Sequence, residues 1–283
     1  MLSTIRIMTY NLLEGLLDKN GAVDETRRKS AIAAVNEIDP DVLVLNEALR
    51  CVPDADGKIN DYAAWFNMPH ALAKTYDGTW GNVILSKLPL RETKTFAIYN
   101  RSGIVAEIMV HSHDDECQNH DNLVVGTYHP HPSRWPAHKA ADFTELVSDI
   151  NAPCLICGDF NAINPEDDPD IERLAVAFKA FTPKGAERSS AERFVAGGKA
   201  VFEALAEIGF TDAVPKESRT PTIPTALIAK PTENETSSAM RIDHVVGNSK
   251  VTIIAGGVLK TEDTDTASDH YPVWVDAVIK TDK

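Results

Sequence analysis

The sequence predicts an α/β protein built from mixed β-sheets that are stacked in layers. Hydrophobic residues make up 43% of the 283 residues, which is enough for a large core and too many for a disordered chain. Segments with the pattern of strands outnumber segments with the pattern of helices, and the two kinds do not alternate strictly. Strict alternation is typical of a purely parallel sheet, so its absence favours mixed sheets.

The first elements along the chain are a strand, a helix and a second strand. Residues 5–10 alternate apolar and polar side chains, as a half-buried strand does, and end at Asn11. Residues 24–38 place apolar side chains on one helical face, begin with acidic residues and stop before Pro40. Residues 41–45 are almost continuously apolar, which predicts a strand buried on both faces.

The rest of the chain contains further strands, two further helices and two long irregular stretches. The strands are expected at residues 82–85, 103–110, 123–128, 154–157, 242–246, 251–259 and 271–279. The helices are expected near 140–150 and 201–208, where apolar residues recur at helical spacing. Residues 182–198 and 215–238 are rich in Pro, Thr, Gly and charge, and predict long surface loops or insertions. The strands after residue 240 are too few to fold alone, so we expect residues 1–283 to form a single domain.

Charge and composition indicate where the protein is located and which partners it can bind. The 28 Lys and Arg residues against 42 Asp and Glu residues give a net charge of −14, which opposes a broad basic surface for nonspecific binding of nucleic acid. A surplus of carboxylates also suits hard divalent cations. No apolar run approaches the ~20 residues of a membrane span and no signal peptide is evident, so we expect a cytoplasmic protein without a transmembrane segment. Four cysteines are too few for a disulfide framework and predict reduced thiols.

Polar side chains gather at the ends of the predicted strands. The residues concerned are Asn11, Asn46, Glu47, His129, Asp159, Asn161, Asp243, His244, Ser268, Asp269 and His270. A buried polar group is costly unless it is paired, so the repetition of this feature indicates a functional site. Carboxylates that can hold Mg²⁺ or Mn²⁺, together with His and Asn side chains, are the residue types of metal-assisted phosphoryl transfer.

Several short motifs occur in the order found in a known family. They are Thr9-Tyr10-Asn11, Leu45-Asn46-Glu47, Gly81-Asn82-Val83-Ile84-Leu85-Ser86, Gly158-Asp159-Phe160-Asn161-Ala162, Arg241-Ile242-Asp243 and Ser268-Asp269-His270. In this combination the chain resembles the endonuclease/exonuclease/phosphatase superfamily, which contains DNase I, from residue 8 to about residue 272. The resemblance implies a four-layer α/β sandwich, with two mixed β-sheets packed face to face and helices outside. It also implies a metal-dependent hydrolase of phosphate esters that uses Mg²⁺ or Mn²⁺.

The resemblance further implies roles for the residues in these motifs. Three residues match positions that hold and orient the metal: Glu47, Asp269 and Asn11. Asp159 matches the residue that activates the attacking water, and Asn161 matches a contact to the phosphate. His270 matches the histidine that stabilises the transition state, with Asp243 as the carboxylate that orients and charges it.

Other positions follow the family pattern less closely. His129 resembles a further family histidine that contacts the phosphate, although Tyr128 and Pro130 replace its usual neighbours. Asn46 replaces a common glutamine, which changes the hydrogen bonds behind the neighbouring carboxylate. We also expect substrate contacts from four nearby residues: Asn82, His131, Arg134 and Trp80.

Aromatic and basic residues near the motifs leave two interpretations open. Trp80 and Trp135 fit either stacking on a substrate or ordinary packing. Arg134 and Lys139 would add local positive charge, although a solvated position on a helix surface explains Lys139 more simply.

Three alternative sites are less well supported by spacing. Residues 268–270 are the types of a serine-hydrolase triad, but adjacent residues cannot face one another and no G-x-S-x-G motif is present. Cys154 and Cys157 point to opposite faces of a strand, which favours buried thiols over a zinc or redox site. Residues 111–120 contain enough His, Cys and acidic side chains for zinc, although a solvated hairpin loop explains them more simply.

The sequence therefore predicts a divalent-metal-dependent phosphoesterase that cleaves a phosphodiester by metal-assisted water attack. We expect a nuclease or nucleotide phosphodiesterase that engages nucleic-acid ends or nucleotides locally. Two alternatives stay open: a lipid or sugar-phosphate phosphoesterase of the same superfamily, and a binding or scaffold protein that has kept the fold without catalysis.

Overall fold

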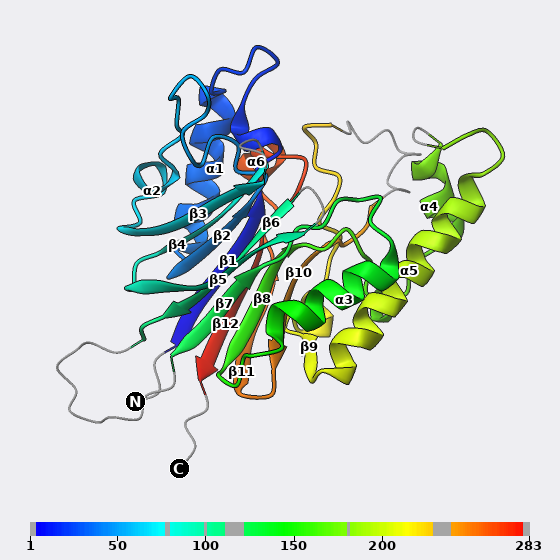
Figure 1. The fold of residues 1–283 in the computed structure, drawn as a ribbon. Helices are drawn as coiled ribbons and strands as arrows, with labels where there is room; N and C mark the ends of the chain where they lie inside the picture. The colour runs from blue at the N-terminus through cyan, green and yellow to red at the C-terminus, as the bar shows by residue number, and fades with distance from the viewer. Residues whose placement is uncertain are drawn as a thin grey trace.

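The chain folds into two β-sheets that face each other, with helices on their outer sides (Figure 1). This structure, a computed structural model, describes residues 4–76, 80–98, 101–110, 122–179, 182–228 and 239–279. Residues 111–120, expected to form a solvated hairpin loop with zinc binding as the alternative, lie outside the described residues. No helix in the described ranges is long and apolar enough to cross a membrane.

Each sheet has six strands among the described residues. The first sheet consists of β1 (Thr4–Asn11), β2 (Val42–Asn46), β3 (His70–Tyr76), β4 (Trp80–Ser86), β11 (Val251–Val258) and β12 (Val273–Ile279), in the order β11-β12-β1-β2-β4-β3. The second consists of β5 (Leu90–Ile98), β6 (Arg101–Ile108), β7 (Leu123–Thr127), β8 (Cys154–Asp159), β9 (Phe210–Asp212) and β10 (Asp243–Asn248), in the order β5-β6-β7-β8-β10-β9. The pairs β1/β2 and β7/β8 are parallel, and the other described pairs are antiparallel. Both sheets are therefore mixed, as predicted.

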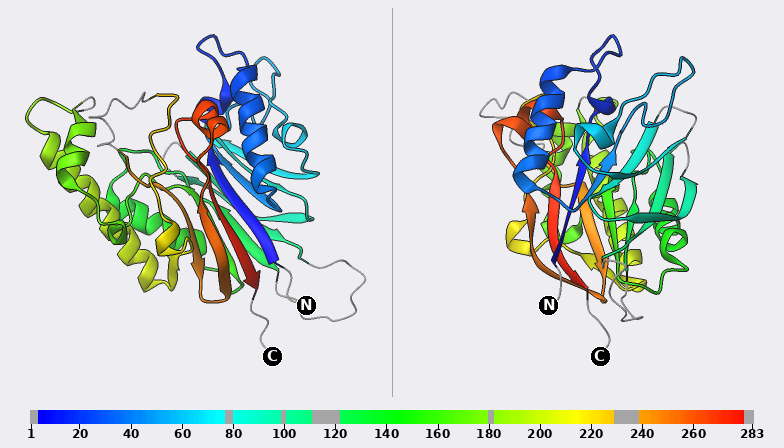
Figure 2. Two further views of the ribbon diagram at one scale, coloured as in Figure 1. Left: turned by 180° about the vertical axis from the view of Figure 1, so that it is seen from behind. Right: turned by 90° about the vertical axis from the view of Figure 1, so that its left-hand side faces the viewer.

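Helices complete the sandwich on both sides (Figure 2). The first sheet is covered by α1 (Glu25–Ile38), α2 (Tyr62–Trp65) and α6 (Glu262–Ala267). The second is covered by α3 (Pro136–Val147) and α5 (Glu187–Glu207), and α4 (Ile171–Phe178) packs on α5. Short 3₁₀ helices are η1 (Glu14–Leu16), η2 (Pro165–Asp167) and η3 (Lys216–Ser218). The four-layer α/β architecture is confirmed.

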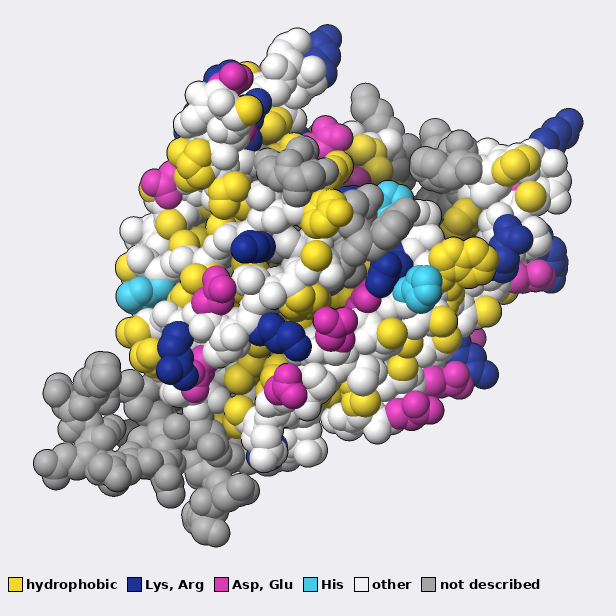
Figure 3. Space-filling model, viewed as in Figure 1, with side chains coloured by type: hydrophobic (Ala, Val, Ile, Leu, Met, Phe, Trp, Pro, Cys, Tyr) yellow, Lys and Arg dark blue, Asp and Glu magenta, His cyan; other side chains and the backbone are white. Residues whose placement is uncertain are grey.

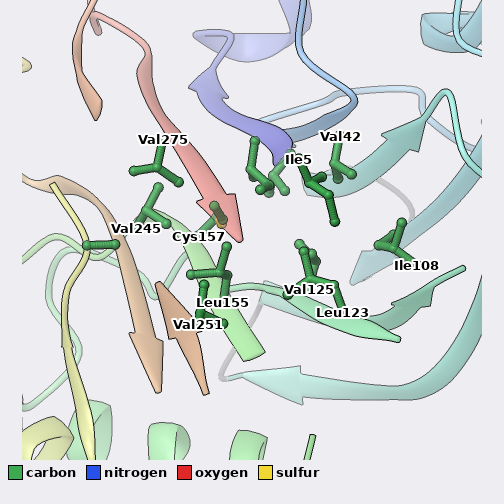
Figure 4. Close-up of a cluster of buried hydrophobic side chains, with 14 of the residues drawn as sticks. Ile5, Val42, Ile108, Leu123, Val125, Leu155, Cys157, Val245, Val251 and Val275 are labelled. Atoms are coloured by element: carbon green, nitrogen blue, oxygen red, sulfur yellow. The ribbon is translucent and has the colours of Figure 1, made fainter. Parts of the chain in front are cut away.

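The main hydrophobic core lies between the two sheets. Figure 4 shows Ile5 and Val42 of the first sheet facing Val125 and Leu155 of the second. Successive side chains on a strand point to opposite faces, so Leu43 packs on the helical side while Val42 packs between the sheets. This double burial explains the continuous apolar sequence of β2.

The two cysteines of β8 divide between the two cores. Cys157 packs between the sheets, and Cys154 packs under α3 and α5. Both are buried free thiols, as their spacing predicted.

One expected loop is largely a helix. Residues 182–198 were predicted to be irregular, but α5 begins at Glu187 and continues to Glu207. Ser and Gly residues lower the intrinsic helix propensity of this stretch, and packing of its buried side chains on α3 and α4 compensates. In the second stretch, 215–238, the described residues contain η3, whereas residues 229–238 lie outside the described part.

Candidate active site

Both sheets bring polar side chains to the same end of the sandwich, where several strands begin or end. In the first sheet, parallel pairing sets Asn11 at the end of β1 beside Asn46 at the end of β2. In the second sheet, antiparallel pairing sets Asp243 at the start of β10 opposite Asp159 at the end of β8. His270 joins them because it precedes β12, which runs antiparallel to β1. Strand direction and register therefore assemble residues that are far apart in the sequence.

His270 and Asp243 form a buried hydrogen-bonded pair. The distance from His270 Nδ1 to Asp243 Oδ2 is 2.8 Å. Burial alone lowers the pKa of His270, but the charge and hydrogen bond of Asp243, with smaller contributions from Asp159 and Asp269, raise the pKa to about 10. His270 is therefore a cation at neutral pH, and its Nε2 atom lies 3.9 Å from Asp159 Oδ2.

Asp159 occupies the centre of the polar cluster. Its Oδ1 atom accepts a hydrogen bond of 2.8 Å from the backbone N–H of Asn161, and its Oδ2 atom accepts one of 3.3 Å from Asn11 Nδ2. Burial, followed by repulsion from Asp243, raises the pKa of Asp159 to about 7. A carboxylate with this pKa can accept a proton and release it again near neutral pH.

Glu47 lies on the other side of Asn11. Its Oε2 atom accepts a 2.9 Å hydrogen bond from the backbone N–H of Glu14, and its Oε1 atom is 3.4 Å from Asn11 Nδ2. The backbone of Glu47 has a φ of 52°, a left-handed conformation that costs energy for a residue with a side chain. Burial raises the pKa of this carboxyl, so the charged form is short of stabilising partners.

Asn46 connects the two sheets behind the cluster. Its Nδ2 atom donates to Asn82 Oδ1 at 2.7 Å, and its Oδ1 atom accepts from the backbone N–H of Asp159 at 2.9 Å. A Cβ atom at Gly158 would lie 2.1 Å from the carbonyl oxygen of Tyr128 and 2.8 Å from Asn46 Oδ1. Glycine is therefore required at this position, before the aspartate.

His129 faces the same cluster from the end of β7. It is 2% exposed, and its Nε2 atom lies 3.6 Å from Asp159 Oδ2 and 3.9 Å from Glu47 Oε1. Burial and the charge of Arg101 hold the pKa of His129 well below its usual value. The cluster thus contains one cationic and one neutral imidazole.

The donor set fits a hard divalent cation. Asp159, Asp243 and His270 offer ligand atoms that all lie within 4.8 Å of one another. His270 is already bonded to Asp243, so we assign those two residues to the hydrogen-bonded pair and not to a metal. Glu47 is a carboxylate whose pKa is raised by burial, and a bound cation would stabilise its charged form. Asp269 is more exposed and has its Oδ1 atom 3.9 Å from His270 Nε2.

The four residues that were expected to contact the substrate each bind to other parts of the protein. Asn82 is buried behind Asn46, and its amide nitrogen donates to the backbone carbonyl of Ser102. Trp80 packs against the guanidinium of Arg101, which lies 4.5 Å from the ring centroid. Arg134 forms two hydrogen bonds of 2.5 Å with Asp142.

His131 is bonded within its own loop, where its Nδ1 atom accepts from the backbone N–H of Ser133 at 3.1 Å. The structure therefore brings the predicted metal and catalytic residues together, but not all of the predicted substrate contacts.

The burial of two basic residues near the cluster was not predicted. Lys139, expected on a solvated helix surface, is 4% exposed and donates from Nζ to the backbone carbonyl of Asn161 at 2.6 Å. Its spacing of four residues from Phe143 on the buried face of α3 was the available signal. Arg27 is buried in α1 and donates to the backbone carbonyls of Leu12, Leu13, Leu17 and Ala267. It thereby ties together the two loops that carry Asn11 and His270.

Two facing mixed sheets, with a cluster of carboxylates and histidines at one end of the sandwich, define a DNase I-like fold. The chain belongs to the endonuclease/exonuclease/phosphatase family, whose model matches residues 8–270. Members of this family are phosphoesterase hydrolases.

Solved structures share the fold at low sequence identity. An AP endonuclease from Archaeoglobus fulgidus is 16% identical with a TM-score of 0.65, and the match covers 98% of this chain and 100% of that one. An endonuclease/exonuclease/phosphatase from Beutenbergia cavernae DSM 12333 is 18% identical with a TM-score of 0.61, covering 98% and 72%. The human nocturnin catalytic domain is 13% identical with a TM-score of 0.55, covering 98% and 95%. No curated protein matches the sequence significantly.

Proposed function

We propose that this protein is a divalent-metal-dependent phosphodiesterase that acts on nucleic-acid ends or nucleotides. The observation that supports this most strongly is the position of Asp159. Its Oδ2 atom lies 3.9 Å from the cationic His270 and 3.3 Å from Asn11, which is itself bonded to Glu47. A proton acceptor, a cation and an oxygen-rich metal site thus surround one small space.

The chain's own residues divide the work of hydrolysis. Asp159 accepts the proton of the attacking water, since its pKa of about 7 permits this near neutral pH. His270, oriented by Asp243, donates from Nε2 to a phosphate oxygen as negative charge develops there. A divalent cation held by Glu47 and Asp269 and oriented by Asn11 would neutralise charge on the phosphate.

The remaining cluster residues hold the phosphate in line with the water. Asn161 keeps its amide near Asp159, with Nδ2 donating to the carbonyl of Pro130 at 3.0 Å. His129, as a neutral imidazole, can donate to a phosphate oxygen without adding charge. The fold shared with a solved AP endonuclease supports a nucleic-acid or nucleotide substrate.

The first test is hydrolysis of bis-p-nitrophenyl phosphate with added Mn²⁺. We expect excess chelator to abolish the reaction and Mg²⁺ or Mn²⁺ to restore it. Asp159→Asn should lower kcat by about 100-fold or more, because it removes the proton acceptor. The matched control Asp149→Asn changes an exposed aspartate after α3 and should leave kcat unchanged. Full activity in chelator or in Asp159→Asn contradicts the proposal.

The second test separates the substrate classes. A metal-supplemented panel should compare single-stranded DNA, abasic duplex, RNA, sphingomyelin, inositol phosphates and a phosphomonoester. Cleavage of a polynucleotide supports the nuclease assignment, whereas cleavage of lipid alone contradicts it. A scaffold protein would leave every substrate intact.

A further inference from the structure

An open pocket adjoins the candidate active site. It has a volume of about 550 Å³ and lies between the segment before α3 and helices α4 and α5. Figure 3 shows hydrophobic side chains gathered at the surface where these helices meet, next to Lys, Arg and His side chains. The volume is in the range of sites that hold small organic ligands, which is about 300–1,000 Å³.

The pocket and the catalytic cluster share residues. Asn161 and Lys139 line the pocket, and Lys139 Nζ donates to the backbone carbonyl of Asn161. On its other side, Asn161 has its Nδ2 atom 3.4 Å from Asp159 Oδ2. A ligand that lies in the pocket can therefore place an attached phosphate at the cluster.

Three aromatic side chains line the pocket. Trp135 is 74% exposed, an unusual position for the largest hydrophobic side chain. Phe178 and Phe194 also line the pocket, with ring centroids 5.6 Å apart. Gly197 and Gly198 also line the pocket, at the point where α5 packs closely on Pro136 and Ile163. This combination suits a flat ring more than a flexible chain.

The rim carries a cation that is available for a phosphate. Arg193 is exposed and donates from Nη2 to Ser190 Oγ at 3.1 Å. It forms no ion pair with a carboxylate among the described residues. In a chain with a net charge of −14, such a cation beside the catalytic cluster favours an anionic ligand.

We propose that this pocket binds the nucleoside of a nucleotide substrate whose scissile phosphate lies at Asp159 and His270. Trp135 stacks on the base, and Arg193 pairs with a neighbouring phosphate. An acyl chain is a poorer occupant, because Ser133, Ser190 and Arg193 interrupt the apolar wall. The proposal rests on the phosphodiesterase function and adds to it a binding site for the nucleoside.

The test uses two esters with the same leaving group. They are the p-nitrophenyl ester of thymidine 5′-phosphate and p-nitrophenyl methyl phosphate, which lacks the nucleoside. Trp135→Ala should lower kcat/KM for the nucleotide ester by about tenfold and leave the methyl ester unchanged. Trp135→Phe should restore most of the loss, because a planar ring remains. Ile254→Ala, a control at an exposed residue of β11, should change neither rate.

The outcomes test nucleoside binding in the pocket separately from the hydrolytic activity. Equal losses on both esters, or no loss on either, overturn the proposal. Trp135-dependent cleavage of a short-chain phosphatidylcholine without any effect on the nucleotide ester also overturns it, in favour of an acyl chain. If the wild type cleaves neither ester, the proposed hydrolysis is wrong. Calorimetric titration with thymidine 5′-monophosphate then shows whether the pocket binds a nucleotide. Binding that Trp135→Ala weakens about tenfold supports the proposal, and no binding overturns it.

Discussion

Lys139 shows how a single buried charge links a helix to the catalytic loop. Its ammonium group gives up water in exchange for a hydrogen bond to the carbonyl of Asn161, and burial lowers its pKa from 10.5 to about 8. The neutral amine still donates to the same carbonyl. The fold therefore tolerates the neutral form better than the charged form.

This pKa predicts how stability depends on pH. Between pH 8 and 10.5, Lys139 is mainly neutral in the folded state and charged in the unfolded state. The unfolded state then binds more protons, so the free energy of unfolding rises with pH in this window. Relative to Lys139→Met, the wild type should gain about 3 kcal/mol across the window. Denaturant unfolding at a series of pH values measures this difference.

The comparison needs a second lysine variant. Lys199→Met removes an exposed lysine of α5 and serves as the matched control for the loss of one lysine side chain. If the stability of Lys139→Met relative to the wild type depends on pH no more than that of Lys199→Met, the assignment of a depressed pKa to Lys139 is wrong. Comparing differences cancels the titration of the tyrosine and cysteine side chains.

The candidate site could be predicted from the sequence only where residues belong to strand ends. Asn11 and Asn46 are brought together by the parallel pairing of two strands that were each recognisable from their apolar pattern. Arg27 and Lys139 could not be assigned in this way, because their partners are backbone carbonyls of distant loops. A charged residue on a helix is usually solvated, so the spacing of Lys139 from Phe143 was a weak signal that only the tertiary structure makes clear.

At the scale of elements, helix α5 is held against the catalytic loop by a close contact at Gly198. A Cβ atom there would lie 2.1 Å from the carbonyl oxygen of Ile163 and 2.9 Å from its backbone nitrogen. Backbone atoms cannot give way as a flexible side chain can. Gly198 therefore sets the distance between α5 and the segment that follows Asn161.

We expect Gly198→Ala to destabilise the protein by about 1–3 kcal/mol through overpacking. This loss should occur although alanine has the higher helix propensity by about 1 kcal/mol. Chemical denaturation would measure it, and the displaced loop should also lower kcat. Ser189→Ala, at an exposed position of the same helix, should stay within about 0.5 kcal/mol of the wild type. A stabilised Gly198→Ala variant would show that α5 is not in tight contact.

Three strands that the sequence did not predict share a physical cause. Strands β3, β5 and β9 lie at sheet edges, where each pairs with one neighbour in its sheet. Edge strands bury less surface and therefore carry weaker apolar patterns than central strands such as β2. Helix α5 was missed over its first half because tertiary packing outweighs its Ser and Gly content.

At the scale of the whole molecule, the negative charge predicts a response to divalent cations. A cation that binds the folded site and not the unfolded chain raises stability as its concentration increases. At about 100 times Kd, Mg²⁺ should raise the thermal midpoint by about 5 °C. Differential scanning calorimetry in chelator and in graded Mg²⁺ measures the shift.

Two glutamate variants separate a specific site from general charge screening. Glu47→Gln should remove most of the Mg²⁺-dependent shift, because it removes a proposed ligand. Glu203→Gln removes one exposed charge on α5 and should keep the full shift. Equal shifts in both variants would mean that Mg²⁺ acts on the surface and not at the cluster.

The position of β12 has a consequence for folding. This strand pairs with β1, and Ser268 Oγ, just before it, donates to the backbone carbonyl of Asn11 at 2.7 Å. Until β12 pairs with β1, one edge of β1 is unpaired and the polar cluster lacks His270. Closing the first sheet and completing the cluster are therefore a single step of folding.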